Sequence, residues 1–399
     1  MRILISAGEA SGEMYGAQLI EALRREISSV QASAGEGARP TPAASGLEFY
    51  GVGGEKMRAA GCDTVVDAKD LSVVGIMEIL SHLAKIWQLF HKLIGEADRR
   101  RPDLAVVIDS PAFNWRVARQ MKKRGIPVVY YVCPQFWAWR QGRVRLLRKY
   151  VDKALVIFPF EERFYRDRGV NAEFVGHPLA ELPRPSISRE QYATEHGLDL
   201  AKQWITLMPG SRAKEVRMNL PGILGAAALL GSEYEFLIPV APTVGSSFIQ
   251  EVVDSHPIPA NNALHLVPEA LPALANSRAG IIASGTATVE AAMMETPFVM
   301  VYRVTRLTYL LGRWTVRVPH FAMVNLIAGE KVVPELVQHD FTAERVAAEL
   351  RRVIADGEAR QKMLSGLKKV NQLLKGSVHE PAPERAARAI YKLLSANFE

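Results

Sequence analysis

The strongest local indication of the fold is the stretch Gly280-Ile281-Ile282-Ala283-Ser284-Gly285-Thr286-Ala287-Thr288-Val289-Glu290. The apolar residues that end at Ala283 predict a buried strand, the small residues after it predict a turn, and a helix follows. Free N–H groups and the helix dipole at such a turn favour an anion such as a phosphate, and the hydroxyls of Ser284, Thr286 and Thr288 add donors. Glu290 lies one helical turn beyond Thr286, where its carboxylate can accept hydrogen bonds from both hydroxyls of a ribose. The stretch also fits an ordinary helix cap followed by an exposed glutamate.

A second strand and turn of this kind lie earlier in the sequence. Residues 204–208 predict a strand, Pro209-Gly210-Ser211-Arg212 a turn, and Lys214 the start of a helix. The guanidinium of Arg212 can pair with a diphosphate through two hydrogen bonds, although an exposed arginine at a turn is equally common. Both turns follow the carboxyl ends of predicted parallel strands, which is the edge where open α/β sheets bind ligands.

The rest of the chain repeats the alternation of short apolar runs and helical stretches, which indicates parallel α/β sheets. A Pro-bearing linker at residues 181–186 separates two halves of similar pattern. We therefore predict two Rossmann-like α/β domains that face each other across a cleft, at residues 1–182 and 187–380, with a C-terminal helix at 384–399 that crosses back to the first domain. Residues 28–45 predict a flexible surface loop. The predicted strands are 2–6, 47–50, 104–108, 128–132, 154–158, 204–208, 235–239, 264–267, 280–283 and 298–302.

In the first half, candidate site residues follow three predicted strands. Gly8 and Gly12 indicate close approach of the backbone to a ligand, although neither their run nor Gly51-Val52-Gly53-Gly54 is a convincing dinucleotide fingerprint. Asp109 ends the strand at 104–108, where its carboxylate suits a general base or simply caps the turn before Pro111. An aromatic loop at 133–140 lines a substrate groove or packs between the domains.

Composition excludes several classes of protein. The chain has 399 residues and two cysteines, Cys62 and Cys133, which argues against a disulfide scaffold or a structural zinc site and fits a reducing compartment. We see no metal-ligand spacing and no Ser-His-Asp pattern. The N-terminal apolar run is too short for a signal peptide, and no apolar stretch approaches the ~18 residues that span a bilayer. We therefore predict a cytoplasmic protein.

The formal charge of +7 favours an anionic partner, either nucleic acid or an acidic membrane face, or serves solubility alone. Residues 71–90 fit a helix that is apolar on more than one face. Together with a basic run at residues 140–153, this stretch resembles an interfacial patch for anionic lipids. A core helix and a solvated helix face are the commoner arrangement. The candidate membrane residues are Val73, Val74, Ile76, Met77 and Leu80.

Taken together and in order, eight motifs resemble the lipid-A-disaccharide synthase family of bacterial glycosyltransferases along nearly the whole chain. They are Gly8-Glu9-Ala10-Ser11-Gly12, Asp109-Ser110-Pro111, Phe113-Asn114, Cys133-Pro134-Gln135-Phe136-Trp137-Ala138-Trp139, Gly176-His177-Pro178-Leu179, Pro209-Gly210-Ser211-Arg212, Ser284-Gly285-Thr286-Ala287-Thr288-Val289-Glu290 and Asn325-Leu326-Ile327-Ala328-Gly329.

The resemblance implies the GT-B arrangement and a transfer between two acylated sugars. UDP-2,3-diacylglucosamine would donate its sugar to 2,3-diacylglucosamine 1-phosphate, giving UDP and a β-1′,6-linked tetra-acyl disaccharide 1-phosphate. Because the donor is α-linked, the transfer inverts the anomeric centre, and one direct displacement with a base suffices. No cofactor and no metal are demanded, since the UDP-sugar is a substrate.

The resemblance also assigns roles to residues. Asp109 becomes the proposed catalytic base. Two positions depart from the family pattern, because Glu13 and Ala112 stand where the family commonly has Asp, and Ala112 leaves Asp109 as the only acid in its turn. The implied nucleotide-sugar site is Gly210, Ser211, Arg212, Ser284, Gly285, Thr286, Thr288, Glu290 and Asn325. The implied acceptor or cleft residues are Gly8, Glu9, Ser11, Gly12, Asn114, Gln135 and Trp137.

The acylated substrates implied by the resemblance make a membrane surface the expected partner. Because such lipids stay in the bilayer, we expect peripheral association with the cytoplasmic face of the inner membrane, with residues 71–90 as a docking or acyl-binding surface. A homodimer is left open. One rival is an isomerase like UDP-N-acetylglucosamine 2-epimerase, which would need no lipid surface. A basic nucleic-acid-binding protein is the other, although no nucleic-acid motif is present.

Overall fold

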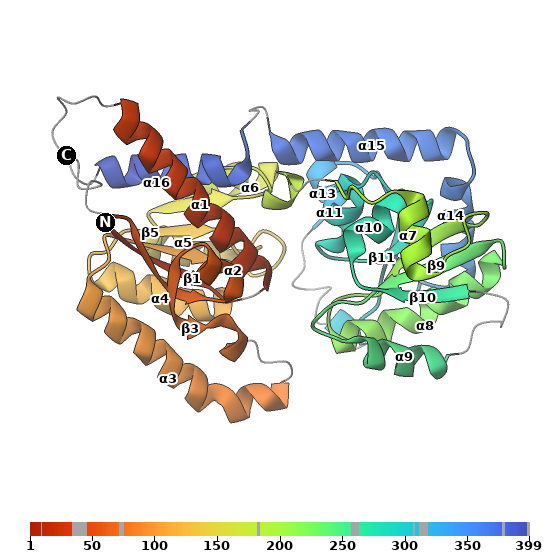
Figure 1. Ribbon diagram of the computed structural model, residues 1–399, viewed down its shortest axis with the longest axis horizontal. Coiled ribbons are helices and arrows are strands. Elements are labelled where there is room, and N and C mark those ends of the chain that lie inside the picture. Colours follow the sequence, from red (N-terminus) through yellow and green to blue (C-terminus); the bar gives the residue numbers. More distant parts are fainter. Residues whose placement is uncertain are drawn as a thin grey trace. The chain divides into compact units, whose positions relative to one another are not determined.

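The computed structural model describes residues 1–8, 10–33, 46–71, 76–181, 184–256, 263–305, 308–310, 318–376 and 380–396. The side chains of residues 10, 30–33, 76–83 and 181 lie outside this description. The chain divides into two compact units, Met1–Glu181 with Lys375–Glu399, and Leu182–Leu374. Each unit is built on one parallel sheet with helices on it (Figure 1). This architecture confirms the predicted α/β class.

The first unit has a seven-stranded sheet in the order β3-β2-β1-β4-β5-β6-β7. Its central strands are buried apart from Arg2 at the start of β1, because helices cover both faces of a parallel sheet. On one face, Leu4 and Val107 pack against Phe90 and Val117. The strands are β1 (Arg2–Ala7), β2 (Glu48–Gly53), β3 (Cys62–Asp67), β4 (Leu104–Ile108), β5 (Val128–Tyr131), β6 (Lys153–Val156) and β7 (Ala172–Phe174). The helices are α1 (Ala10–Ser33), α2 (Glu55–Ala59), α3 (Ile76–Arg100), α4 (Pro111–Lys123), α5 (Val144–Tyr150), α6 (Pro159–Arg166) and α16 (Ala382–Ala396).

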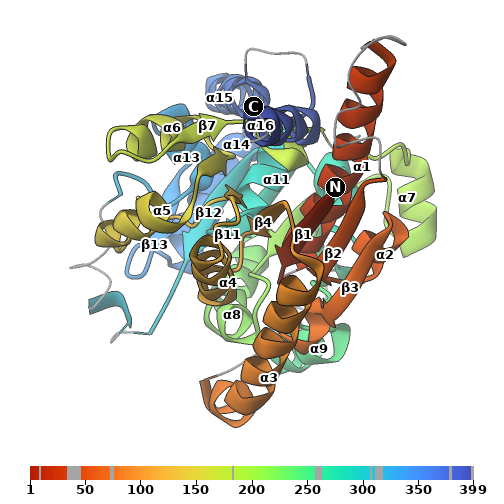
Figure 2. The same cartoon turned by 90° about the vertical axis from the view of Figure 1, so that its left-hand side faces the viewer.

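The C-terminal helix α16 returns to the first unit, as predicted, and packs alongside α1 (Figure 2). Arg25 and Glu384 form an ion pair of 2.6 Å between the two helices. The helix begins at Ala382 rather than at residue 384, because Pro383 is well tolerated in a first helical turn. The loop predicted from residue 28 is wrong for 28–33, where α1 continues; residues 34–45 lie outside the described part of the chain.

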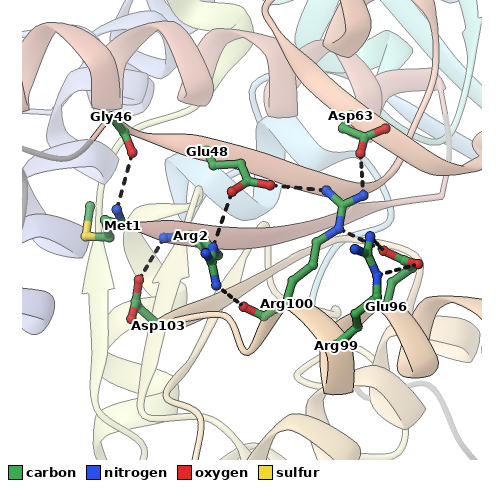
Figure 3. Close-up of polar contacts among 9 residues, drawn as sticks. All are labelled: Met1, Arg2, Gly46, Glu48, Asp63, Glu96, Arg99, Arg100 and Asp103. Atoms are coloured by element: carbon green, nitrogen blue, oxygen red, sulfur yellow. Dashed lines mark hydrogen bonds and ion pairs between the residues drawn. The ribbon is translucent and has the colours of Figure 1, made fainter.

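An ion-pair network closes the amino edge of this sheet (Figure 3). Arg100, at the end of α3, contacts Glu48 at 3.2 Å, Asp63 at 2.6 Å and Glu96 at 2.8 Å. Its guanidinium also lies 4.7 Å from the ring centre of Tyr50. The network connects the end of α3 to the starts of β2 and β3. It lies at the edge of the sheet opposite to the carboxyl ends of the strands.

The second unit has a six-stranded sheet in the order β10-β9-β8-β11-β12-β13. Ser188 caps the first helix of this unit by accepting a hydrogen bond from the N–H of Gln191, and Gly197 ends that helix with a φ of 64°. The strands are β8 (Gln203–Met208), β9 (Tyr234–Pro239), β10 (Ala263–Val267), β11 (Ala279–Ala283), β12 (Phe298–Tyr302) and β13 (Glu335–Val337). The helices are α7 (Arg189–His196), α8 (Ala213–Leu230), α9 (Ser246–Asp254), α10 (Ala270–Asn276), α11 (Ala287–Met293), α13 (Met323–Ala328), α14 (Ala343–Ile354) and α15 (Glu358–Lys375).

The predicted apolar helix at 71–90 corresponds to part of α3, which extends to Arg100. Of the candidate membrane residues, Val73 and Val74 lie outside the described residues. Ile76, Met77 and Leu80 belong to the backbone of α3, and their side chains lie outside the description. Among the helices that the structure describes, none combines the length and apolarity needed to cross a bilayer.

Candidate functional site

The second sheet brings the two predicted phosphate turns together. β8 and β11 are neighbours, and Ile282 pairs with Met208 at the carboxyl ends of both strands. The chain leaves β8 toward β9 on one side, while β11 continues to β12 on the other. This is the topological switch point, where open α/β sheets form their ligand crevice. The turns at 209–212 and 284–286 therefore begin side by side.

The turn after β8 presents Arg212. Gly210 has a φ of 125°, and a Cβ added there would lie 2.6 Å from the Cβ of Glu215, so glycine is required. The carboxylate of Glu215 accepts a hydrogen bond of 3.1 Å from the N–H of Ser211 and lies 3.3 Å from the guanidinium of Arg212. The Arg212 side chain is nevertheless 72% exposed. Its guanidinium is positioned at the turn and open to a ligand.

The buried side chain of Asn219 holds the turn after β8 in place. Its amide donates to the carbonyl of Pro209 at 3.0 Å and accepts from the N–H of Arg303 at 2.9 Å. The turn after β8 is thereby joined to the end of β12. Neither Asn219 nor Glu215 was a predicted site residue, because their partners come from backbone groups that no local motif identifies.

The turn after β11 keeps backbone donors free. Gly285 has a φ of 140°, and a Cβ added there would meet nothing within 4 Å, so the space beside it is open. The N–H groups of Gly285 and Thr286 have no acceptor among the described residues. Of the three predicted hydroxyl donors, Ser284 donates to the carbonyl of Phe321 at 2.8 Å and Thr288 to that of Gly285 at 2.8 Å. Thr286 is exposed and remains the available hydroxyl.

Glu290 lies one turn into α11. Burial raises the pKa of its carboxyl above the ordinary value. Its carboxylate has no hydrogen-bond or ion-pair partner in the described part of the chain. Since a desolvated carboxylate without partners is costly, ligand hydroxyl groups would stabilise it.

Asn325 was predicted at the nucleotide-sugar site, and the structure shows that its side chain is held inside the second unit. It is fully buried, its amide donates to Val333 O at 3.0 Å and to Glu335 at 2.8 Å, and its oxygen accepts from Val332 N and Val333 N. The amide of Asn325 therefore has its hydrogen-bond partners within the protein, and it connects α13 to residues 332–335. Glu335, which sequence reasoning missed, also accepts from the N–H of Ala322 at 2.9 Å and so orders the start of α13.

The first sheet has its own switch point, between β1 and β4. Ala7 pairs with Ile108, so Gly8 and Asp109 lie side by side at the carboxyl edge. A Cβ added to Gly8 would lie 2.7 Å from the hydroxyl of Ser110, so a larger residue there would require the Ser110 side chain to shift. Asp109 and Ser110 both have left-handed backbones, with φ of 46° and 43°. Asp109 is partly exposed at this edge.

Buried Asn114 holds this strained turn. Its amide nitrogen contacts the carbonyls of Asp109 at 2.8 Å, Ile108 at 2.9 Å and Ser6 at 3.2 Å, while its oxygen accepts from the hydroxyl of Ser6 at 2.7 Å. The hydroxyl of Tyr130 also donates to the carbonyl of Asp109 at 2.8 Å. Asn114 was predicted as an acceptor or cleft residue, and the structure gives it the task of orienting Asp109.

The other predicted residues of the first unit divide between surface and core. Ser11 and Gln135 are exposed. A Cβ added to Gly12 would lie 3.7 Å from the carbonyl oxygen of Ile108, which is an ordinary van der Waals contact. Glu9 lies outside the described residues. Trp137 is 6% exposed and its indole donates to buried Glu161 at 2.8 Å, so it braces the aromatic loop.

The two departures from the family pattern lie at different places. Glu13 accepts a hydrogen bond of 2.7 Å from the N–H of Lys56 and thus satisfies a donor in the first turn of α2. Ala112 is exposed in the first turn of α4, close to Asp109 in the sequence. Across the described residues, no group of three or more His, Cys, Asp or Glu could hold a metal.

Solved structures identify the class of fold. The structure is similar to MurG from Acinetobacter baumannii, with 14% identity, coverage of 98% of this chain and 99% of that one, and a TM-score of 0.55. It is also similar to UDP-GlcNAc 2-epimerase from Neisseria meningitidis bound to UDP-GlcNAc, with 12% identity, coverage of 99% and 100%, and a TM-score of 0.60. At these identities the likeness shows the fold alone, which is the GT-B fold with two Rossmann-like units.

Sequence comparison gives the family. The family model described as lipid-A-disaccharide synthetase matches residues 3–390. Lipid-A-disaccharide synthase of Koribacter versatilis is 52% identical over 391 residues, 98% of each chain. That of Acidobacterium capsulatum is 46% identical over 382 residues, covering 93% of this chain and 91% of the relative. The chain belongs to the lipid-A-disaccharide synthetase family, and the predicted resemblance is confirmed.

Proposed function

We propose that this enzyme is an inverting glycosyltransferase that moves 2,3-diacylglucosamine from UDP-2,3-diacylglucosamine to 2,3-diacylglucosamine 1-phosphate. One observation carries the proposal beyond family membership. Each of the two sheets has polar groups at its switch point, and the two sets are chemically complementary. The second unit offers cationic and N–H donors for a diphosphate, and the first offers the carboxylate of Asp109 for an acceptor hydroxyl.

The donor would bind to the second unit. The guanidinium of Arg212 and the free N–H groups of Gly285 and Thr286 suit the oxygens of a pyrophosphate. Glu290, whose carboxylate has no partner among the residues that the structure describes, suits the hydroxyls of the ribose. Gly210 and Ser211 shape the first turn, Ser284 and Thr288 shape the second, and Asn325 braces the chain beside them.

The transfer would proceed as one displacement. Asp109 removes the proton from the acceptor hydroxyl, and that oxygen attacks the anomeric carbon of the donor from the face opposite UDP. The bond between the anomeric carbon and UDP breaks, and its electrons pass to the diphosphate. Arg212 and the backbone donors stabilise the negative charge that develops there. Because Ala112 carries no acid, Asp109 takes the proton without a neighbouring carboxylate in its turn.

We also propose that the enzyme works at the cytoplasmic face of the inner membrane, where its acylated substrates would lie. We define the basic edge as Arg140, Arg143, Arg145 and Lys149, all exposed. None of these four side chains forms a salt bridge within the described residues. The guanidinium of Arg140 lies 4.3 Å from the ring centre of Trp139, which is 45% exposed. An exposed tryptophan beside unpaired cations suits an anionic membrane surface.

A direct assay separates this proposal from the isomerase. Pure protein is incubated in detergent with UDP-2,3-diacylglucosamine, with and without 2,3-diacylglucosamine 1-phosphate. We expect UDP only when the acceptor is present, in an amount equal to the disaccharide formed. An altered UDP-sugar without acceptor would instead favour the epimerase-like alternative.

A further inference from the structure

A cavity of about 640 Å³ lies in the first unit between α3 and α4. Its size falls within the range of roughly 300–1,000 Å³ that small-molecule sites occupy. One end reaches Ser110, the neighbour of the proposed base Asp109. The cavity therefore adjoins the proposed acceptor site, and its wall on α3 belongs to residues 71–90, for which the family resemblance implies only a general docking or acyl-binding surface.

The walls of this cavity are mainly apolar. Trp87 and Phe90 of α3 are stacked with ring centres 5.3 Å apart, and Phe113 of α4 meets Phe90 edge to face at 5.9 Å. Trp87 is 53% exposed, which leaves a large apolar surface for a ligand to cover. Arg116 is the one charged side chain among the described residues that line the cavity. This combination suits an aliphatic chain attached to an anionic head.

Ala112 forms part of the wall between the apolar end and the Asp109 turn. A methyl group at this position can contact a hydrocarbon chain. A carboxylate there would have to lose its hydration against the chain, which is costly. The departure from the family pattern at this position thus makes the wall more apolar in this chain.

We propose that this cavity binds one acyl chain of the acceptor and so holds the acceptor hydroxyl near Asp109. The inference rests on the proposed function, because the base must contact the acceptor. The chain is assigned to the acceptor because the proposed nucleotide-binding groups of the donor lie in the second unit, at residues 209–212 and 284–290.

Calorimetric titration of the full-length protein tests this assignment without any turnover. The probes are 2,3-diacylglucosamine 1-phosphates with short, water-soluble acyl chains that lengthen by one methylene at a time. We expect affinity to rise by up to about fourfold per methylene until the cavity is full, since a buried methylene contributes ~0.8 kcal/mol. The heat capacity change of binding should become more negative along the series.

Substitutions in the cavity wall test the same assignment, and Ala112→Leu has a matched control on the same helix. Ala112→Leu fills the cavity and should flatten the rise in affinity, whereas Arg119→Leu, exposed on the same helix but outside the cavity, should leave it unchanged. Leucine is a good helix former at both positions. Trp87→Ala should also flatten the rise, because it removes an exposed apolar ring from the cavity wall.

An equally steep rise in Ala112→Leu and in the wild type would overturn the assignment. So would an equally steep rise for phosphatidylglycerols with the same short chains, because the cavity would then take a membrane lipid. Neither outcome bears on acceptor-dependent release of UDP. Conversely, a lack of UDP release would remove the proposed function while leaving the chain-length dependence of binding as a separate fact.

Discussion

Asp109 and Ser110 show how single residues prepare the first switch point. Two successive non-glycine residues in the left-handed region cost roughly 1–2 kcal/mol each. Asn114 offsets this cost with hydrogen bonds to Asp109, Ile108 and Ser6. The sequence predicted Asn114 as a site residue but not its task, because Ser6 and Asn114 are 108 positions apart.

Asp109→Asn tests the proposed base with little disturbance of the backbone, because asparagine tolerates the left-handed conformation that alanine does not. We expect kcat to fall by about 10²–10⁴-fold, the usual contribution of a general base, while the Kd for UDP stays unchanged. Steady-state kinetics and UDP titration check this. Asp167→Asn, an exposed aspartate of the same unit, serves as the control. Turnover near that of the wild type would remove Asp109 from the mechanism.

At the level of elements, the buried strands and the apolar edge strand β10 were predictable, whereas the three other edge strands were not. β4 and β12 have the predicted bounds, because a continuous apolar run leaves little freedom in a parallel sheet. The sequence missed β3, β7 and β13, which lie at sheet edges. β7 and β13 have three residues each, and β3 mixes Cys, Asp and Thr with valine, so neither length nor pattern marked them.

The network at the end of α3 allows a prediction about stability. Arg100→Ala should lower the free energy of unfolding by about 1–3 kcal/mol, because a side chain only 16% exposed loses three carboxylate contacts and its place over Tyr50. Arg99→Ala should cost less than about 1 kcal/mol, since Arg99 is 65% exposed and pairs only with Glu96 among the described residues. Urea unfolding of both variants checks this. Equal losses would show that burial of the network does not matter.

Buried Glu161, which lies in α6 just after β6, predicts that the stability of the protein depends on pH. Burial raises the pKa of Glu161 from 4.5 to about 7, against the lowering effect of hydrogen bonds from Trp137, Phe158 and Ile157. Between these two values the unfolded chain has lost the proton while the folded chain retains it. The contribution of Glu161 to the free energy of unfolding therefore falls as pH rises from 4.5 to about 7, by up to about 1.4 kcal/mol per pH unit.

Glu161→Gln removes this titration. The stability of the wild type relative to the variant should fall as pH rises from 4.5 to about 7. Chemical denaturation at several pH values measures the difference. The ring of His177 packs at a tilt of 47° against Phe158, and burial lowers its pKa to about 3. The contribution of His177 to stability therefore rises with pH, but it is the same in both proteins and cancels in the difference. A constant difference between the two proteins would contradict the raised pKa of Glu161.

At the scale of the whole molecule, the sequence predicted the α/β class, the return of the C-terminal helix and the family. It also predicted that the turns carrying Arg212 and Glu290 share a sheet edge, and the neighbouring β8 and β11 place them side by side. The cavity beside Ser110 was beyond prediction, because its walls come from α3 and α4, which meet through packing. The predicted roles of the two units as acceptor and donor domains stay proposals.

Membrane contact is a property of the whole surface and predicts a dependence on salt. Vesicles with anionic lipids should bind the protein, and neutral vesicles should bind it less. Replacing Arg140, Arg143 and Arg145 with glutamate should weaken binding by about 1 kcal/mol or more per site, with a smaller effect at high salt. Vesicle flotation measures this. Unchanged binding of the triple variant would exclude the basic edge as the docking surface.

In the proposed mechanism, Asp109 activates the acceptor for a single displacement while the second unit holds the leaving UDP. The decisive measurement is the configuration of the new glycosidic bond, determined by NMR on the disaccharide made by the pure protein. We expect a β linkage from the α-linked donor. An α linkage would contradict this mechanism, because a single displacement from the face opposite UDP must invert the anomeric carbon.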